Sequence, residues 1–229
     1  MPVLYVVATP IGNLEDISKR ALRTLSEVDL ILCEDTRVTR KLLDHYQIKI
    51  KTPVISYHQH SKINKIEYII GFLRRGKDLA LVSDAGTPGI SDPGGKLISE
   101  VYNLGFKICP IPGASAVITA ASVSGFPTDR FIFMGFPPQK KKRKKFFEEA
   151  MNQSAKYPVI FYESPYRILK TLEELKVMNN KLILMVCREL TKKFETIYRG
   201  EIGGVIGNIK KGEIKGEFTV VLGGKNVIK

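Results

Sequence analysis

Four short segments of this sequence carry the residue types of a small-molecule site. They are rich in glycine, proline, hydroxyls and carboxylates, and each follows an apolar run: residues 9–14, 34–37, 84–95 and 112–116. Glycine lets a ligand reach main-chain N–H and C=O groups without interference from a Cβ atom, and proline fixes the turn. Any one segment alone could be a plain tight turn. Four of them together predict a preformed pocket, provided that the fold brings them to one place.

The elements around these segments predict that they meet. Apolar, β-branched runs predict strands at 3–8, 30–33, 54–57, 79–83 and 107–110, and amphipathic patterns predict helices at 16–28, 36–46, 63–75 and 94–104. Alternating strands and helices indicate an α/β fold with a mostly parallel sheet. Ligands of such sheets bind beyond the carboxyl ends of the strands, which is where all four segments lie.

The second half of the chain follows a different pattern. Strands are predicted at 131–135, 159–162, 182–186, 196–199 and 218–222, but only 166–178 and 203–209 have the pattern of helices between them. Fewer helical crossovers mean more antiparallel pairs, so we expect a second α/β domain with a mixed sheet. The sequence thus predicts two domains, residues 1–113 and 114–229, joined where Pro112 and Gly113 mark a turn.

The net charge of +13 is concentrated in the second predicted domain. Residues 1–113 hold 15 basic and 12 acidic side chains, a net +3, and residues 114–229 hold 21 and 11, a net +10. Six of these charges form one uninterrupted run: Lys140, Lys141, Lys142, Arg143, Lys144 and Lys145. Like charges repel, so we expect an exposed, mobile linker between a strand that ends at Gly135 and a helix that starts near Phe146. The run is either a solvated loop or a surface that binds a polyphosphate partner such as a nucleic acid backbone, and release of counterions favours the second.

Other classes of protein and of site are not indicated. Three cysteines, Cys33, Cys109 and Cys187, lie far apart in apolar runs and predict buried thiols in a reducing cytoplasm. No apolar stretch reaches the roughly 18 residues that a membrane span needs. The glycine patterns of dinucleotide-binding and P-loop folds are absent, and no cluster of histidines, cysteines and carboxylates has metal-ligand spacing. We therefore expect a cytoplasmic protein without a metal.

Charged residues follow three of the predicted strands. Glu34, Asp35 and Arg37 come after one strand, Glu163 and Arg167 after a second, and Arg188 and Glu189 after a third. Carboxylates and guanidinium groups beside a binding edge can serve acid–base catalysis and hold a substrate. They could equally form a structural ion-pair network that bridges the two domains, and the sequence leaves both interpretations open.

Seven motifs in a fixed order identify a family resemblance. They are T-P-I-G-N-L-E-D from Thr9, E-D-T-R from Glu34, V-S-D-A-G-T-P-G-I-S-D-P-G from Val82, P-G-A-S-A from Pro112, G-F-P-P from Gly135, Y-E-S-P-Y-R from Tyr162 and R-E-L-T-K-K-F-E from Arg188. In this order the sequence resembles the ribosomal RNA small-subunit methyltransferase I group of the tetrapyrrole methylase superfamily. The resemblance implies two α/β domains with S-adenosylmethionine in the cleft between them, and a homodimer. It also implies methylation of the 2′-hydroxyl of a cytidine in the decoding region of 16S ribosomal RNA within the small subunit.

The resemblance also implies which residues bind the cofactor. They are Pro10, Asp84, Ala85, Gly86, Gly89, Ile90, Ser115, Ala116, Tyr162 and Leu190. A carboxylate at the carboxyl end of a strand independently suits a cationic or hydroxyl-bearing ligand, which agrees with the assignment of Asp84. The alternative for Asp84 is an N-cap of the following turn.

Transfer of a methyl group to a ribose hydroxyl sets requirements for the substrate side. Sulfur, methyl and oxygen must lie in line within about 3–3.5 Å, and a base or a cation should assist the poor nucleophile. We expect Asp35 or Glu163 to accept the proton, and Arg37 and Arg167 to orient phosphate or ribose.

Two other functions are compatible with the resemblance. One is methylation of a small tetrapyrrole or corrin, and the other is a non-enzymatic RNA-binding assembly factor. The basic run argues against the first, and the intact glycine-rich loops argue against the second. Many members of the group continue into a helical appendage after the last strand; this sequence ends shortly after that strand, and we expect the basic run to compensate.

Overall fold

The computed structural model describes residues 1–48, 53–58 and 63–223, which form two compact units. Unit 1 comprises Met1–Ser115 and unit 2 comprises Ala116–Lys229. The structural boundary lies two residues after the predicted domain boundary at 113/114. Each unit has its own sheet and its own hydrophobic core.

Unit 1 is built on five parallel strands in the order β3-β2-β4-β1-β5. The strands are β1 (Val3–Val7), β2 (Leu30–Cys33), β3 (Val54–Ser56), β4 (Leu79–Val82) and β5 (Lys107–Ile111). Every residue of β2 and β4 is buried, as expected for strands covered on both faces. The predicted parallel α/β architecture is confirmed.

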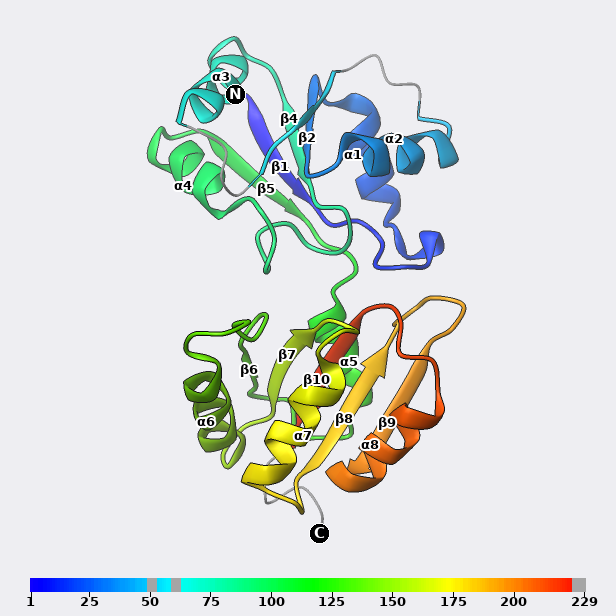
Figure 1. Ribbon diagram of the computed structural model, residues 1–229. Helices are drawn as coiled ribbons and strands as arrows, with labels where there is room; N and C mark the ends of the chain where they lie inside the picture. Colours follow the sequence, from blue (N-terminus) through cyan, green and yellow to red (C-terminus); the bar gives the residue numbers. More distant parts are fainter. Residues whose placement is uncertain (49–52, 59–62, 224–229) are drawn as a thin grey trace. The chain divides into compact units, whose positions relative to one another are not determined.

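Helices cover both faces of this sheet (Figure 1). The helices α3 (Ile63–Arg74) and α4 (Gly95–Asn103) pack on the face that carries Leu4, Leu30 and Leu32. The helices α1 (Lys19–Glu27) and α2 (Thr36–His45) pack on the other face. The single helix predicted at 16–28 is wrong at its start. A separate 3₁₀ turn, η1 (Leu14–Asp16), precedes α1, because the Ser18 hydroxyl caps α1 by accepting the N–H of Ala21.

Unit 2 is built on a mixed sheet in the order β6-β7-β10-β8-β9. Its strands are β6 (Ile132–Phe133), β7 (Val159–Glu163), β8 (Ile183–Arg188), β9 (Thr196–Glu201) and β10 (Phe218–Leu222). Only β6 and β7 pair in parallel, and the other pairs are antiparallel. The predicted mixed second sheet is confirmed.

Four helices accompany this second sheet. The helices α6 (Arg143–Ser154), α7 (Ile168–Met178) and α8 (Ile202–Lys211) bury their apolar sides in one core, and α5 (Ala116–Val123) lies against β10 and β7. The sequence pattern predicted α7 and α8 between the strands, and a helix that starts near Phe146 after the basic run. It did not reveal the full extent of α5, whose small apolar residues give little amphipathic pattern.

The predicted exposed linker at residues 140–145 is wrong in part. Helix α6 begins at Arg143 rather than near Phe146, so half of the basic run is helical. Lys140, Lys141, Lys142, Lys144 and Lys145 are exposed, but Arg143 is only 7% exposed. The side chain of Arg143 lies inside unit 2, where it pairs with carboxylates.

The structure tests two expectations from the sequence: that the cysteines are buried free thiols, and that no segment is long and apolar enough to span a membrane. Cys33 and Cys187 are free and buried, whereas Cys109 is free but only partly buried, because β5 is an edge strand. Burial raises the pKa of the Cys187 thiol to about 12. In the described part of the chain, no helix has the length and apolar character to cross a membrane.

Unit 2 tolerates no side chain at Gly223, directly after β10. A Cβ atom there would lie 2.7 Å from the ring of Phe126 and 3.2 Å from the carbonyl oxygen of Ile183. We expect Gly223→Ala to lower the free energy of unfolding by about 1–3 kcal/mol. Gly207→Ala is the matched control: it lies mid-helix with open space around its Cβ, so it should raise stability by roughly 0.5–1 kcal/mol. Urea denaturation of both variants measures the difference, and equal effects would contradict tight packing at Gly223.

Candidate active site

The four glycine-, proline- and carboxylate-rich segments converge at one edge of the sheet in unit 1. Thr9 and Gly86 exchange two backbone hydrogen bonds of 2.9 and 3.1 Å, which join the segments after β1 and β4. The Thr87 hydroxyl donates to the carbonyl oxygen of Ala114 at 3.1 Å, which adds the segment after β5. The N–H of Asp35 donates to the carboxylate of Asp84 at 2.9 Å, which adds the segment after β2.

Glycines in the loop after β4 are required by its backbone conformation. Gly86 and Gly89 have φ values of +84°, and Gly94 has +150°, a region that other residues rarely adopt. A Cβ atom at Gly94 would also lie 3.0 Å from the side chain of Leu81. The loop can therefore keep this path only with glycine at these positions, and the path leaves Ala85, Gly89 and Ile90 exposed.

The carboxylate of Asp84 connects two strands. It accepts the backbone N–H of Asp35, which follows the neighbouring strand β2. The N-cap position of α4, the helix that follows the loop, is occupied by Gly94, without a side-chain cap hydrogen bond. The alternative of Asp84 as an N-cap of the following turn thus finds no support in its bonding. Its side chain lies half-buried at the point where the segments meet.

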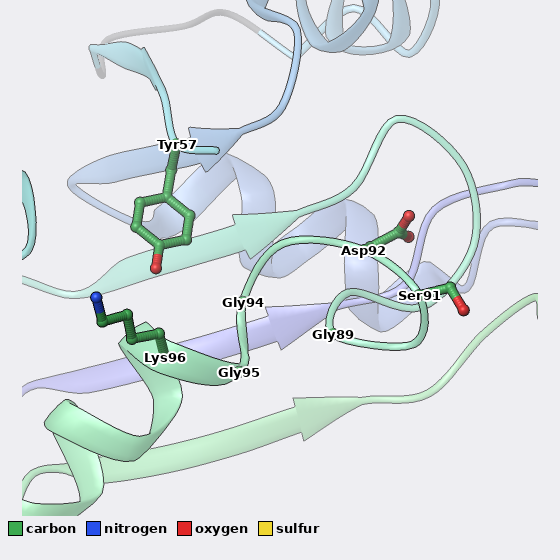
Figure 2. Close-up of a pocket in the computed structure, with 7 residues that line it drawn as sticks. All are labelled: Tyr57, Gly89, Ser91, Asp92, Gly94, Gly95 and Lys96. Carbon is green, nitrogen blue, oxygen red and sulfur yellow. The ribbon is translucent and has the colours of Figure 1, made fainter. Parts of the chain in front are cut away.

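A cavity of about 480 Å³ lies beside the same loop (Figure 2). It is lined by Tyr57, Gly89, Ser91, Asp92, Gly94, Gly95 and Lys96. The Tyr57 hydroxyl points toward Lys96 and the start of α4, where it bonds to the backbone of Leu97. Burial raises the pKa of Tyr57. Tyr57 and Lys96 were not predicted from the sequence; a polar aromatic residue directly after β3 was the available signal.

Asp35 and Arg37 form an ion pair at the start of α2. Asp35 is the N-cap of that helix and accepts the backbone N–H of Arg37 at 2.8 Å. The guanidinium group of Arg37 donates to both carboxylate oxygens, with a shortest distance of 2.6 Å. These bonds lower the pKa of Asp35 to about 2. A carboxylate with so low a pKa is a weak proton acceptor.

Glu34 is in the opposite electrostatic situation. Its side chain is half-buried after β2, and burial is the largest cause that raises its pKa, followed by the nearby charge of Asp84. The charge of His58 acts in the other direction. A carboxyl group with a raised pKa accepts a proton near neutral pH more readily than Asp35 does.

Glu163, at the end of β7 in unit 2, is a fully bonded buried carboxylate. One oxygen accepts the N–H of Ser164 at 2.8 Å and forms an ion pair with the guanidinium group of Arg167, also at 2.8 Å. The other accepts the hydroxyl of Thr171 at 2.6 Å and lies 3.7 Å from Arg143. This arrangement matches an ion-pair network within unit 2. A role of Glu163 as proton acceptor, and of Arg167 in orienting substrate, remains a prediction from the sequence.

The remaining residues predicted to bind the cofactor are Pro10, Ser115, Ala116, Tyr162 and Leu190, and they lie in both units. Pro10 is buried after β1, and Ser115 and Ala116 lie at the unit boundary where α5 begins. The ring of Tyr162 packs against the rings of Phe133 and Phe136 at 5.0 and 5.2 Å, and Leu190 is buried after β8. Their contacts with a cofactor remain predictions. Among the described residues, no three histidine, cysteine or acidic side chains gather as a metal site.

Comparison with known proteins decides the family. Residues 3–206 match the model of the Tetrapyrrole (Corrin/Porphyrin) Methylases. The chain belongs to this family. Solved members and neighbours have the same fold: a cobalt precorrin-4 methyltransferase superposes with a TM-score of 0.70 at 18% identity, covering 96% of this chain and 94% of its own. A diphthine synthase gives 0.70 at 15% identity, covering 96% and 90%.

Curated relatives are much closer in sequence. The chain is 46% identical over 222 residues to the Ribosomal RNA small subunit methyltransferase I of Halalkalibacterium halodurans, covering 96% of this chain and 75% of the relative. It is 45% identical to the protein of that name in Bacillus subtilis, covering 99% and 76%. The Thermotoga maritima protein of that name is 43% identical, covering 98% and 100%. The resemblance indicated by the seven motifs is confirmed.

The ion pair at the start of α2 generates a prediction about Asp35. In Arg37→Ala the carboxyl loses its guanidinium donors but keeps the backbone N–H, so its pKa should rise from about 2 part of the way toward the ordinary aspartate value. Because the pKa is lowered in the folded state, the pair stabilises the fold above the ordinary aspartate pKa, and this contribution is lost as the pH falls toward 2. Carbon-detected NMR titration of the carboxyl groups measures the shift. Arg40→Ala, on the same helix, is the control, and an unchanged Asp35 pKa in Arg37→Ala would refute the assignment.

Proposed function

We propose that this protein transfers a methyl group from S-adenosylmethionine to the 2′-hydroxyl of a cytidine in the small-subunit ribosomal RNA. The observation that carries this proposal is the identity of 43–46%, over nearly the whole chain, to proteins named Ribosomal RNA small subunit methyltransferase I. The protein is accordingly a methyltransferase that modifies ribosomal RNA. The cytidine and its position in the decoding region rest on the family resemblance.

S-adenosylmethionine is the methyl donor of this family. The converged segments of unit 1 fit such a ligand, since Ala85 and Gly89 in the loop after β4 are exposed, and Asp84 supplies a carboxylate for its polar groups. At Gly113, a Cβ atom would lie 3.0 Å from the Cβ atom of Ala8, so the chain also passes closely at the end of β5. When bound, the cofactor supplies an electrophilic methyl group on a sulfonium.

The nucleophile in this reaction is a ribose hydroxyl, which must lose a proton. Glu34 is the better acceptor at neutral pH, because its pKa is raised, whereas the pKa of Asp35 is about 2. Arg37 is exposed and paired with Asp35, and it remains a candidate for contact with a substrate phosphate.

Neither alternative function is favoured. A small tetrapyrrole substrate is at odds with relatives that are named for ribosomal RNA, although the fold is shared with precorrin methylases. A non-enzymatic RNA-binding factor would not need a loop whose three glycines have positive φ values beside a half-buried carboxylate. We further propose that the chain acts as a homodimer on the small subunit in the cytoplasm, which rests on the resemblance.

Cofactor binding and methyl transfer test the proposal together. Asp84→Asn keeps an oxygen for the N–H of Asp35 but removes the charge, so the fold should persist while affinity for S-adenosylmethionine falls by about tenfold or more. Asp44→Asn, an exposed site on α2, makes the same charge change and should have no effect. Calorimetry measures binding. Radiolabelled cofactor with unmodified small ribosomal subunits measures transfer, and nuclease mapping should place one methyl on a cytidine ribose.

Two results would contradict the proposal. One is an affinity of Asp84→Asn for S-adenosylmethionine equal to that of the wild type, which would mean that the loop after β4 does not bind the cofactor through Asp84. The other is absence of label in the ribosomal RNA when the wild-type protein binds cofactor.

A further inference from the structure

Unit 2 exposes two aromatic side chains on adjacent segments. Tyr166, in the turn between β7 and α7, is 97% exposed, and Phe136, in the segment after β6, is 54% exposed. A large aromatic ring held almost wholly in water gains little from the fold itself. One exposed ring is ordinary, but two on adjacent segments are a candidate for a surface that binds a partner.

Hydrogen bonds hold these two segments together. The guanidinium group of Arg167, next to Tyr166, donates to the carbonyl oxygen of Pro137 at 3.0 Å. The N–H of Tyr162 donates to the carbonyl oxygen of Gly135 at 2.9 Å. The two exposed rings thus come from neighbouring parts of one fixed surface.

Arg143 fixes the basic run beside the same segments. It donates to the carbonyl oxygen of Pro138 at 3.3 Å, to the hydroxyl of Thr171 at 2.7 Å and to the carboxylate of Glu174 at 2.9 Å. Because this one member of the run is anchored inside, the run cannot drift away from the segment that carries Phe136.

The other members of the run remain available in solvent. All five are exposed: Lys140, Lys141, Lys142, Lys144 and Lys145. Of these five lysines, only Lys144 lies within ion-pair distance of a carboxylate of the described residues, that of Glu148 at 3.8 Å on the same helix. The surface therefore carries an excess of positive charge next to two stacking rings.

We propose that Phe136, Tyr166 and these five lysines form a platform that binds single-stranded RNA, with bases stacked on the rings and phosphates against the lysines. The inference rests on the proposed function only in taking RNA as the substrate. Every base has a face that can stack on an aromatic ring, but only in a single strand is that face free. Lysines act as point charges and do not read bases, so the platform sets affinity and leaves the choice of nucleotide to the active site.

The platform is rigid before RNA arrives. Two consecutive prolines, Pro137 and Pro138, restrict the first segment, and the buried Glu163 holds Arg167 of the turn at 2.8 Å. A surface that is ordered in advance loses little conformational entropy on binding.

Removal of the exposed ring tests stacking. In fluorescence anisotropy with a short, labelled single-stranded RNA and no cofactor, Tyr166→Ala should weaken binding by about tenfold, the scale of one lost base–aromatic stack. Tyr166→Phe keeps the ring and should bind like the wild type. Tyr102→Ala is the matched control, because Tyr102 is an equally polar aromatic, 74% exposed on α4 of unit 1.

Replacement of the five lysines by glutamine tests the phosphate contacts. Each lost contact with a single strand should reduce the slope of log affinity against log salt by about 0.7. Arg143 stays in place in this variant, so the fold of unit 2 is preserved. A duplex RNA of the same sequence should bind the wild type and Tyr166→Ala with equal affinity, because its bases are not free to stack on the ring.

Three results would overturn the platform. One is equal affinity of the wild type and Tyr166→Ala for the single strand, and another is an unchanged salt slope in the lysine variant. The third is a loss of duplex affinity in Tyr166→Ala as large as its loss of single-strand affinity. These measurements need no methyl transfer. If methylation of ribosomal RNA failed while Tyr166→Ala weakened single-strand binding, the proposed function would fall and the platform would stand.

Discussion

The buried charge of Glu163 is the constraint on which the outer surface of unit 2 depends. A carboxylate that is 1% exposed is stable only when hydrogen bonds and opposite charges surround it. The protein supplies these from Arg167 in the turn after β7 and from Thr171 on α7, with Arg143 at the start of α6 nearby. The same network therefore fixes the turn after β7 and the start of α6. Through hydrogen bonds from Arg167 and Arg143 it also holds the segment that contains Pro137 and Pro138. The exposed rings and lysines owe their positions to a group that they do not touch.

In unit 1 the positions of the site residues depend on the backbone conformation of the loops after the strands. A parallel sheet places the carboxyl ends of its strands at one edge, and the segments there must turn sharply into helices. Glycines with positive φ values make those turns in the loop after β4, and Asp84 bonds that loop to the segment after β2. The position of Asp84 also helps to raise the pKa of Glu34, while Arg37 lowers that of Asp35. Glu34 and Asp35 are neighbours in the sequence, but their pKa values are shifted in opposite directions.

Periodicity and strand composition predicted both sheets, because buried parallel strands are continuous apolar runs and the crossover helices have one apolar face. The convergence of the four segments followed from that topology. Side-chain direction could not be predicted in the same way. Nothing in six consecutive basic residues distinguishes Arg143, because the partners of its buried side chain, Glu163, Thr171 and Glu174, lie 20 to 31 positions away in the sequence. For the same reason the sequence did not separate Glu34 from Asp35, since only burial and neighbouring charges do so. Tyr57 was missed because its role in the cavity arises from contact with α4.

A double-mutant cycle between Arg143 and Glu163 tests most directly whether the buried carboxylate draws this arginine out of the basic run. The free energies of unfolding of the wild type, Arg143→Met, Glu163→Gln and the double variant would be measured by urea denaturation. We expect each single change to be destabilising and the two to be coupled by about 1–3 kcal/mol, as for groups within one ion-pair network. A coupling indistinguishable from zero would mean that the two side chains act independently, and that Glu163 is not what holds Arg143 inside unit 2.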